Sequence, residues 1–290
     1  MNPIPHDFSL LSFMNQNAHL SRRFSGMNRL YGDGATERLA QAHVCVIGVG
    51  GVGSWAVEAL ARCGVGTLTL IDADHVVESN VNRQIQAVTD NLGKAKITAL
   101  AERIAQINPN ALVHQVDDFV LADTLDLIPA SAHVVLDCTD QVKAKLAMIG
   151  FCAQRRQKLL TCGAAGGKTD AARVVLADLA HSVQDPILSK IRQQLRRAQR
   201  IDHQQASDKS QKFSKHKKVA TKMNVPVLYS DEAVRYPPIE QSCMAENPAP
   251  QGLNCAGFGS SVMVTASFGM LAAQWAVAEI LHSAVSPTSR

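Results

Sequence analysis

The chain has 290 residues, of which 46% are hydrophobic and 19% charged, and its net charge is +4. This balance is typical of a soluble globular protein with one large domain or two small ones. The seven cysteines include no pair with the spacing CxxC, which excludes a four-cysteine zinc site of the usual paired kind. The first twenty residues lack a basic start followed by an apolar core, so we expect no secretory signal, reduced thiols and a cytoplasmic protein.

Apolar runs and helical periodicity predict alternating strands and helices after residue 43. We expect a disordered extension over residues 1–20 and short helices over residues 21–43. The predicted strands cover residues 44–47, 67–72, 113–116, 134–137, 159–161, 173–179 and 225–229. The predicted helices cover residues 53–62, 94–107 and 142–154. Buried strands separated by helices indicate an α/β fold, a Rossmann-like, doubly wound and mostly parallel sheet that binds its ligand at the carboxyl edge. The strand over residues 173–179 is a candidate antiparallel strand.

A basic stretch interrupts this alternation. Residues 190–222 hold eleven Lys or Arg side chains against two Asp, a net charge of +9, so the remainder of the chain carries −5. The sequence predicts a helix over residues 187–200 and a mobile loop over the polar residues that follow it. We therefore expect a single domain over residues 21–285 with a basic crossover insertion at residues 187–224.

The C-terminal residues 257–281 are apolar for more than twenty positions, so contact with a membrane is one interpretation. Many of these residues are small, and Gln274 and Glu279 lie among them. No basic cluster stands directly beside the stretch to anchor a membrane span. We favour a buried helix packed closely against the sheet.

A glycine loop follows the first strand. Gly48, Gly50, Gly51 and Gly53 fit the pattern GxGxxG between a strand and a helix, where backbone N–H groups and the helix dipole attract phosphate. Asp72 lies about twenty residues further on, at the end of the next strand, as a ribose-binding carboxylate does. These features alone fit an NAD-dependent dehydrogenase as well as an ATP enzyme.

The residues after Asp72 separate these two classes. Asn80, Asn82 and Arg83 follow within twelve residues, and Lys96 stands early in the next predicted helix. Cations aimed at one polyphosphate would stabilise charge on a leaving group, a task that NAD binding does not require. This cluster favours an enzyme that uses ATP to activate a carboxylate.

The motif series GVGGVG, DAD, SNVNRQ, GKAK and DCTD resembles the ubiquitin-activating-enzyme-like adenylating superfamily, which includes activators of small sulfur-carrier proteins. Within that superfamily, further motifs are similar to those of the tRNA threonylcarbamoyladenosine dehydratases. They are RFSGMNRLYG near the N-terminus, AAGG at residues 164–167, DLAHSVQDPI at residues 178–187 and NCAGFGSSVMVTASFG at residues 254–269. The resemblance implies a fold of the adenylating-enzyme type.

The resemblance also implies roles in ATP binding. It places Gly50 and Gly51 under the phosphates and Asp72 at the ribose, and it directs Asn80, Arg83 and Lys96 to the phosphates. It makes Asp140 the magnesium ligand. A lone Asp after a strand, at the ligand edge, independently suits a hard cation that bridges phosphate oxygens. Asp137 is the alternative ligand, or else a structural acid.

Dimers of this superfamily can contribute an N-terminal arginine to the partner's ATP site, so the resemblance implies a homodimer. Gly26 stands where the sulfur-carrier activators have their second arginine, which leaves Arg23 or Arg29 as the substitute. Cys255 matches a cysteine of the dehydratases and is a candidate nucleophile or sulfur acceptor for a cysteine-desulfurase system, or a structural residue. Cys243 is a second candidate.

The implied function is the ATP-dependent dehydration of threonylcarbamoyladenosine in tRNA, a cyclisation through an acyl-adenylate of the side-chain carboxylate. A tRNA would also explain the basic insertion, since Lys and Arg bind nucleic-acid phosphates. The candidate tRNA-binding residues are Arg196, Arg197, Arg200, Lys215, Lys217 and Lys218. The main alternative is adenylation of the C-terminal carboxylate of a ubiquitin-like sulfur carrier. A dehydrogenase and a non-catalytic tRNA-binding module are the remaining hypotheses.

Overall fold

A computed structural model describes residues 22–206, 222–236 and 258–283. Its centre is a seven-stranded sheet with the strand order β3-β2-β1-β4-β5-β7-β6. All neighbouring strands pair in parallel except β6, which runs antiparallel to β7. The strands are β1 (His43–Ile47), β2 (Thr67–Ile71), β3 (Leu112–Val116), β4 (Val134–Asp137), β5 (Lys158–Cys162), β6 (Val174–Asp178) and β7 (Pro226–Ser230). The predicted mostly parallel sheet and its antiparallel strand over residues 173–179 are confirmed.

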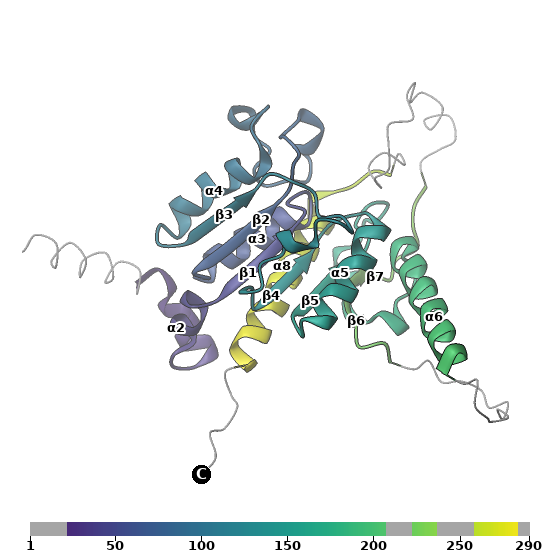
Figure 1. The fold of residues 1–290 in the computed structure, drawn as a ribbon. Helices are drawn as coiled ribbons and strands as arrows, with labels where there is room; N and C mark the ends of the chain where they lie inside the picture. Colours follow the sequence, from purple (N-terminus) through teal and green to yellow (C-terminus); the bar gives the residue numbers. More distant parts are fainter. Residues whose placement is uncertain (1–21, 207–221, 237–257, 284–290) are drawn as a thin grey trace, which may run out of the picture.

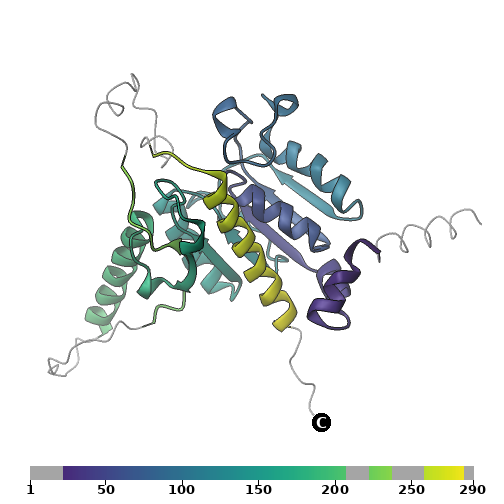
Figure 2. The same cartoon turned by 180° about the vertical axis from the view of Figure 1, so that it is seen from behind.

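Helices cover both faces of the sheet (Figures 1 and 2). They are α2 (Ala35–Ala40), α3 (Gly53–Arg62), α4 (Lys96–Ile107), α5 (Val142–Gln154), α6 (Pro186–Ala206) and α8 (Val262–Ser283), and residues 22–31 are also helical. Strand β1 explains the two layers, because its side chains alternate between the faces. Val44 and Val46 pack in one core cluster with α3, α4 and α8, whereas Cys45 and Ile47 pack in the other with α5 and α6.

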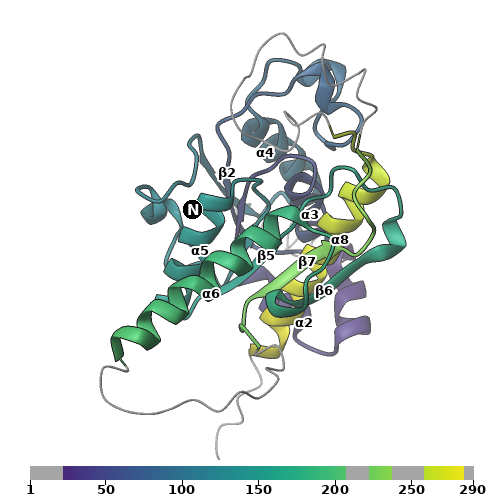
Figure 3. The same cartoon turned by 90° about the vertical axis from the view of Figure 1, so that its right-hand side faces the viewer.

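The basic insertion begins with a longer helix than expected. Helix α6 starts at Pro186 and continues to Ala206, beside α5 (Figure 3). The Asp185 carboxylate accepts a hydrogen bond from the N–H of Leu188 at 2.8 Å, which satisfies a free donor of the first turn. Among the described side chains of α6, which end at residue 198, the buried ones are Ile187, Leu188 and Ile191 in the first turns. The polar segment predicted as a mobile loop, residues 202–218, is helical over residues 202–206, where α6 continues, and its remainder lies outside the described residues, as does the predicted N-terminal extension.

The C-terminal apolar stretch forms the core helix α8. By length and composition, Val262–His282 could cross a membrane, but it packs against α3 and the sheet. Phe268, Ala272 and Ala276 are fully buried in the same cluster as β1 and α3. The side of α8 that faces α3 carries Gly269, where an added Cβ would lie 2.6 Å from the Cβ of Trp55 and 2.6 Å from the carbonyl oxygen of Val52. Glycine therefore permits a close approach of the two helices, and the favoured buried-helix interpretation is confirmed.

Candidate active site

A cavity in the described part of the chain lies at the carboxyl ends of the central strands. Chain connections leave β1 toward β2 on one side and β4 toward β5 on the other, so the order of the strands reverses between β1 and β4. Ligands of open α/β sheets bind at such switch points. Here a cavity of about 200 Å³ is lined by Ile47 of β1, Ile71 of β2, Cys138 after β4 and Gly163 after β5. Seven of the residues predicted to bind the nucleotide or metal line this cavity: Gly48, Gly50, Gly51, Asp72, Arg83, Lys96 and Asp140.

The glycine loop is built for close approach. Gly48 has φ of 80°, and a Cβ there would lie 3.1 Å from the backbone of Cys138. A Cβ on Gly53 would lie only 1.9 Å from the carbonyl oxygen of Gly48, so Gly53 closes the turn and does not line the cavity. Val52 precedes α3 and has no polar side chain to cap it. The N–H groups at the start of α3 can therefore serve an anion at the cavity.

Asp72 is fixed by backbone donors at the mouth of the loop. Its Oδ2 accepts from the N–H of Val49 at 2.8 Å, and its Oδ1 accepts from the N–H of Asp74 at 2.9 Å. Burial raises the pKa of the Asp72 carboxyl, an effect that the positive charge of Lys96 opposes. The carboxyl thus links the glycine loop of β1 to the end of β2.

Lys96 brings a buried cation to the same place. Its side chain enters the cavity from the first turn of α4 and is 7% exposed, and its Nζ lies 2.6 Å from Oδ2 of Asp74. Asp74 also lines the cavity, although the sequence motifs indicate no role for it. Asp74 neutralises Lys96, whose ammonium is a cation that can also bind a phosphate at the cavity.

Arg83 is held through its backbone. Its carbonyl oxygen accepts from Nε1 of Trp55 at 3.0 Å and lies 3.3 Å from Oγ1 of Thr265, so α3 and α8 both hold it. Its guanidinium donates to the carbonyl of Ser79 and, at 2.9 Å, to Oδ1 of Asn82. The side chain thus reaches the cavity from a segment that the two helices fix.

Asn80 does not line the cavity. Its side chain is buried, and Oδ1 accepts a hydrogen bond from the N–H of Val77 at 3.2 Å, which stabilises the short helical turn at Glu78–Asn80. The structure therefore shows a local structural task for Asn80, and its contact with phosphate stays a prediction. Its neighbour Asn82 instead donates to the carbonyl of Ser260, which lines the cavity, at 2.9 Å.

Asp137, the last residue of β4, and Asp140, which follows the strand, lie in different surroundings. Asp140 lines the cavity, whereas Asp137 is fully buried, with its Oδ1 3.0 Å from Nζ of Lys145. Lys145 is equally buried and also donates to the carbonyl of Cys162 at 2.8 Å. This ion pair favours the structural alternative for Asp137, and Asp140 stays the predicted metal ligand.

The cavity can hold magnesium only together with a phosphate ligand. Among the described residues, no cluster of three His, Cys, Asp or Glu side chains could hold a metal ion. Magnesium usually takes one or two carboxylates and completes its shell with phosphate oxygens and water. Asp140 and Asp74 both line the cavity, so the donors present fit magnesium that arrives with a nucleotide.

Arg23 is already used within its own chain. One guanidinium nitrogen of Arg23 donates to the carbonyls of Gln106 at 3.1 Å and Ile107 at 2.8 Å, and so caps the C-terminus of α4. That contact argues against Arg23 as the arginine donated to a partner, and Arg29 stays the candidate.

Several predicted residues lie outside the cavity or outside the description. Arg196 and Arg197 are exposed on α6, away from the cavity-lining residues. The side chain of Arg200 is outside the description, and so are Lys215, Lys217, Lys218, Cys243 and Cys255. Cys138 does line the cavity, but the thiol of Cys162, with its Sγ 3.9 Å away, and burial raise the pKa of Cys138. A thiol of this kind is a poor nucleophile.

The fold and the cavity together define a nucleotide-binding protein of the doubly wound α/β class. The chain belongs to the ThiF family, whose model matches residues 22–289. It is 41% identical to the tRNA threonylcarbamoyladenosine dehydratase of Escherichia coli over 91% of this chain and 95% of that protein. It is 38% identical to the dehydratase of the same name from Haemophilus influenzae, over 90% and 94% of the two chains. The crystal structure of the Escherichia coli enzyme in complex with ATP superposes with a TM-score of 0.73 at 40% identity, over 91% of this chain and 96% of that one.

Proposed function

We propose that this protein is an ATP-dependent dehydratase of tRNA that cyclises the threonylcarbamoyl side chain of a modified adenosine. The observation that carries the proposal is the similarity to dehydratases of this name over nine-tenths of both chains. The cavity adds support, because a glycine loop, a ribose-type acid and two cations converge there. This arrangement suits a reaction that breaks a polyphosphate, and a dehydrogenase has no need of the two cations.

The protein's own residues supply position and charge. The N–H groups of the glycine loop and of the start of α3 face the ATP phosphates, and Asp72 accepts from the ribose hydroxyls. Arg83 and Lys96 neutralise the charge that grows on the departing pyrophosphate. Lys96 exchanges its contact with Asp74 for a phosphate when ATP binds.

The reaction then follows from proximity. The side-chain carboxylate of the substrate attacks the α-phosphorus, pyrophosphate leaves, and an acyl-adenylate forms. The neighbouring carbamoyl group attacks this acyl carbon, closes a five-membered ring and expels AMP. The oxygen lost from the substrate departs in AMP, so the net change in the modified base is the loss of water. Ring closure within one side chain is fast because the reacting groups are already adjacent.

Asp140 would hold magnesium at the cavity, and the ion would neutralise phosphate oxygens when it is bound. The variant Asp140→Ala tests this role by its ATP affinity with and without the metal. We expect magnesium to tighten ATP binding to the unchanged protein and to have little effect on the variant. Equal magnesium dependence of the two proteins would show that the ion binds elsewhere.

We infer the remaining partners from the basic residues of the chain and from its family. The exposed Arg196 and Arg197 of α6 would contact phosphates of the tRNA, together with Arg200 and with Lys215, Lys217 and Lys218 further along the chain. In a homodimer, Arg29 would be the arginine offered to the partner's site. A cysteine-desulfurase or sulfur-acceptor system would act at Cys255, and the protein would work in the cytoplasm.

Mass analysis of tRNA nucleosides tests the function directly. The protein, ATP and tRNA carrying threonylcarbamoyladenosine should give a nucleoside lighter by one water, and the variant Arg83→Ala should give far less of it. Unmodified tRNA is the matched substrate control. ATP–pyrophosphate exchange that is stimulated by a small sulfur-carrier protein and not by the modified tRNA would overturn the proposal in favour of carrier adenylation.

A further inference from the structure

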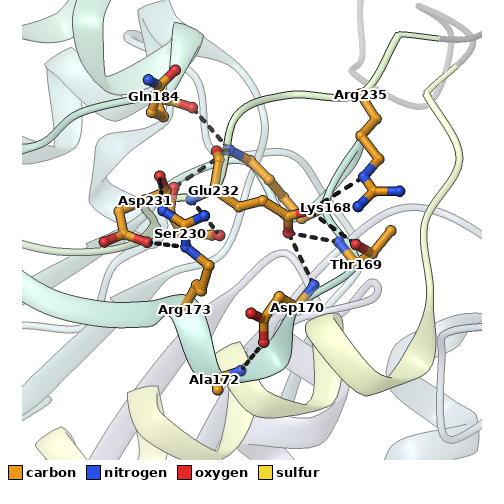
Figure 4. A network of polar contacts seen from close by, with 10 residues as sticks. All are labelled: Lys168, Thr169, Asp170, Ala172, Arg173, Gln184, Ser230, Asp231, Glu232 and Arg235. Carbon is orange, nitrogen blue, oxygen red and sulfur yellow. Dashed lines mark hydrogen bonds and ion pairs between the residues drawn. The ribbon is translucent and has the colours of Figure 1, made fainter.

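The segment after β5 connects the cavity to a second polar network. Ala164, Ala165 and Gly166 line the cavity together with Gly163. The next residues, Gly167 and Lys168, turn away from it and bind other parts of the chain. One continuous stretch therefore forms a cavity wall and the start of the network drawn in Figure 4.

Gly167 joins two regions that are far apart in the sequence. Its N–H donates to the carbonyl of Gly259 at 2.8 Å, and its carbonyl accepts from the N–H of Arg235 at 2.8 Å. The residue has φ of 71°, and a Cβ on it would lie 2.9 Å from Val234. The rings of Tyr236 and Phe258 lie 5.4 Å apart beside this junction. Gly167 thus holds the chain on both sides of residues 237–257 next to the cavity wall.

Lys168 holds in place the segments that meet at Gly167. Its side chain is 2% exposed, and its ammonium donates to the carbonyl of Gln184 at 2.9 Å and to that of Glu232. The carbonyl of Ser230 lies 3.4 Å from the same nitrogen. Figure 4 shows the ammonium between these segments. One buried cation therefore ties the end of β7 and the turn before α6 to the wall of the cavity.

The carboxylate of Glu232 completes this attachment. It accepts from the N–H of Thr169 at 2.8 Å, from the N–H of Asp170 at 2.9 Å and from the hydroxyl of Thr169 at 2.9 Å. Glu232 stands three residues before Arg235, the partner of Gly167. The residues that follow β7 are therefore bound to the stretch after β5 at two positions, Glu232 and Arg235.

The junction also reaches Arg83. Gly259 precedes Ser260, whose carbonyl accepts from Asn82, and Asn82 in turn accepts from the guanidinium of Arg83. The glycine loop and Asp72 follow β1 and β2, and Lys96 begins α4; within the described residues, their hydrogen bonds do not reach Lys168 or Gly167. The network therefore contacts the side of the cavity formed by residues 163–166 and Arg83. It does not contact the side that carries Asp72.

We propose that Lys168 is a positioning residue for the reaction: its ammonium sets the wall at residues 163–166 and the rim at Arg235 and Gly259, so that the substrate's carboxylate meets the α-phosphorus. The inference rests on the proposed function. A lysine is a costly way to fill a buried site if packing alone is required, because a side chain of similar size without charge packs there as well. An ammonium that directs three carbonyls instead fixes the orientation of the segments that carry them.

The variant Lys168→Met shortens the side chain by a single atom and removes the donor. We expect its affinity for ATP, measured by calorimetry, to stay within about twofold of the unchanged protein. We expect its tRNA-dependent release of pyrophosphate to fall at least about tenfold, since small misplacements of reacting groups have effects of this size. Lys158→Met is the matched control, because Lys158 lies at the opposite end of β5, 57% exposed, and should leave both quantities unchanged.

A second variant and a second measurement keep the outcome decisive. Gly167→Ala breaks the junction and leaves the lysine in place, so it should show the same loss of turnover with ATP affinity retained. Hydrogen exchange at the N–H groups of Gly167 and Arg235 should be faster in Lys168→Met than in the control.

Unchanged turnover in both variants, or ATP affinity that falls as far as turnover, would overturn the positioning role. If the unchanged protein released no pyrophosphate with modified tRNA, the proposed function would be wrong. Hydrogen exchange would still test the hydrogen-bond network in that case. Unchanged exchange in Lys168→Met would show that Lys168 does not hold the network together.

Discussion

The buried ion pair beneath the cavity offers a sharp test of the structure. Lys145→Met would leave the carboxylate of Asp137 fully buried without its cation, which lies 3.0 Å away in the unchanged protein. At that distance the attraction is about 5 kcal/mol for an effective dielectric constant of 20. Removal of one partner of such a pair typically costs about 3–5 kcal/mol. Because whole domains are stable by only about 5–15 kcal/mol, we expect a loss of about a fifth or more of the stability.

Urea denaturation of the two proteins measures this loss, and the melting temperature should fall by about 6–20 °C. The double variant Asp137→Asn with Lys145→Met removes both charges and should recover part of the stability, since no unpaired charge then stays buried. A loss below about 1 kcal/mol in Lys145→Met, or a double variant no more stable than the single one, would refute the reasoning.

Three further predictions concern other parts of the chain. Arg83→Ala should lower ATP-dependent turnover about 100- to 1,000-fold with little change in melting temperature, and normal turnover would remove Arg83 from the phosphate site. The amide donors of Asp170 and Thr169 lower the pKa of Glu232 from 4.5 to about 2. Its contribution is therefore complete above pH 4.5 and lost as the pH falls to about 2, so Glu232→Gln should flatten acid denaturation in that window. Gly269→Ala should cost about 1–3 kcal/mol in denaturant titrations because the backbone and Cβ atoms around it cannot move aside, whereas Gly150→Ala, in open space on α5, should be neutral or stabilising.

The core elements were predictable because burial marks them strongly. The predicted helices at residues 53–62 and 142–154 coincide with α3 and α5, and the strand at residues 134–137 coincides with β4. The predicted helix at residues 187–200 is one residue shorter than α6 at its start and six residues shorter at its end, because the fully buried apolar side chains described for α6 lie in its first turns. The polar remainder has no apolar stripe that distinguishes a helix from a loop.

The residues of the site could be predicted where the chemistry of the ligand requires a particular residue type. They were less predictable where the packing of the fold decides which of several similar residues faces the cavity. Asp72, Arg83, Lys96 and Asp140 meet at one cavity although the chain separates them widely. The inward turn of Asn80 and the capping contact of Arg23 depend on neighbours that no local pattern reveals.

Lys145 did carry a signal in the sequence. It shares the buried face of α5 with Met148, Ile149 and Cys152, and a lysine in such a stripe requires an acid, which Asp137 supplies. Lys168 gives no comparable sign, because its three carbonyl partners come from backbone segments that are distant in sequence.

The close packing of α8 on α3 has a consequence for protein synthesis. Helix α3 emerges from the ribosome near the start of the chain, but its covering helix is complete only at Ser283. Until then the apolar strip around Ala56 and Leu60, which α8 and the sheet bury in the finished fold, lacks one of its two partners. The nucleotide-binding part of the chain therefore cannot complete its fold before α8 has been synthesised. A chain cut before α8 would expose that strip to chaperones and proteases.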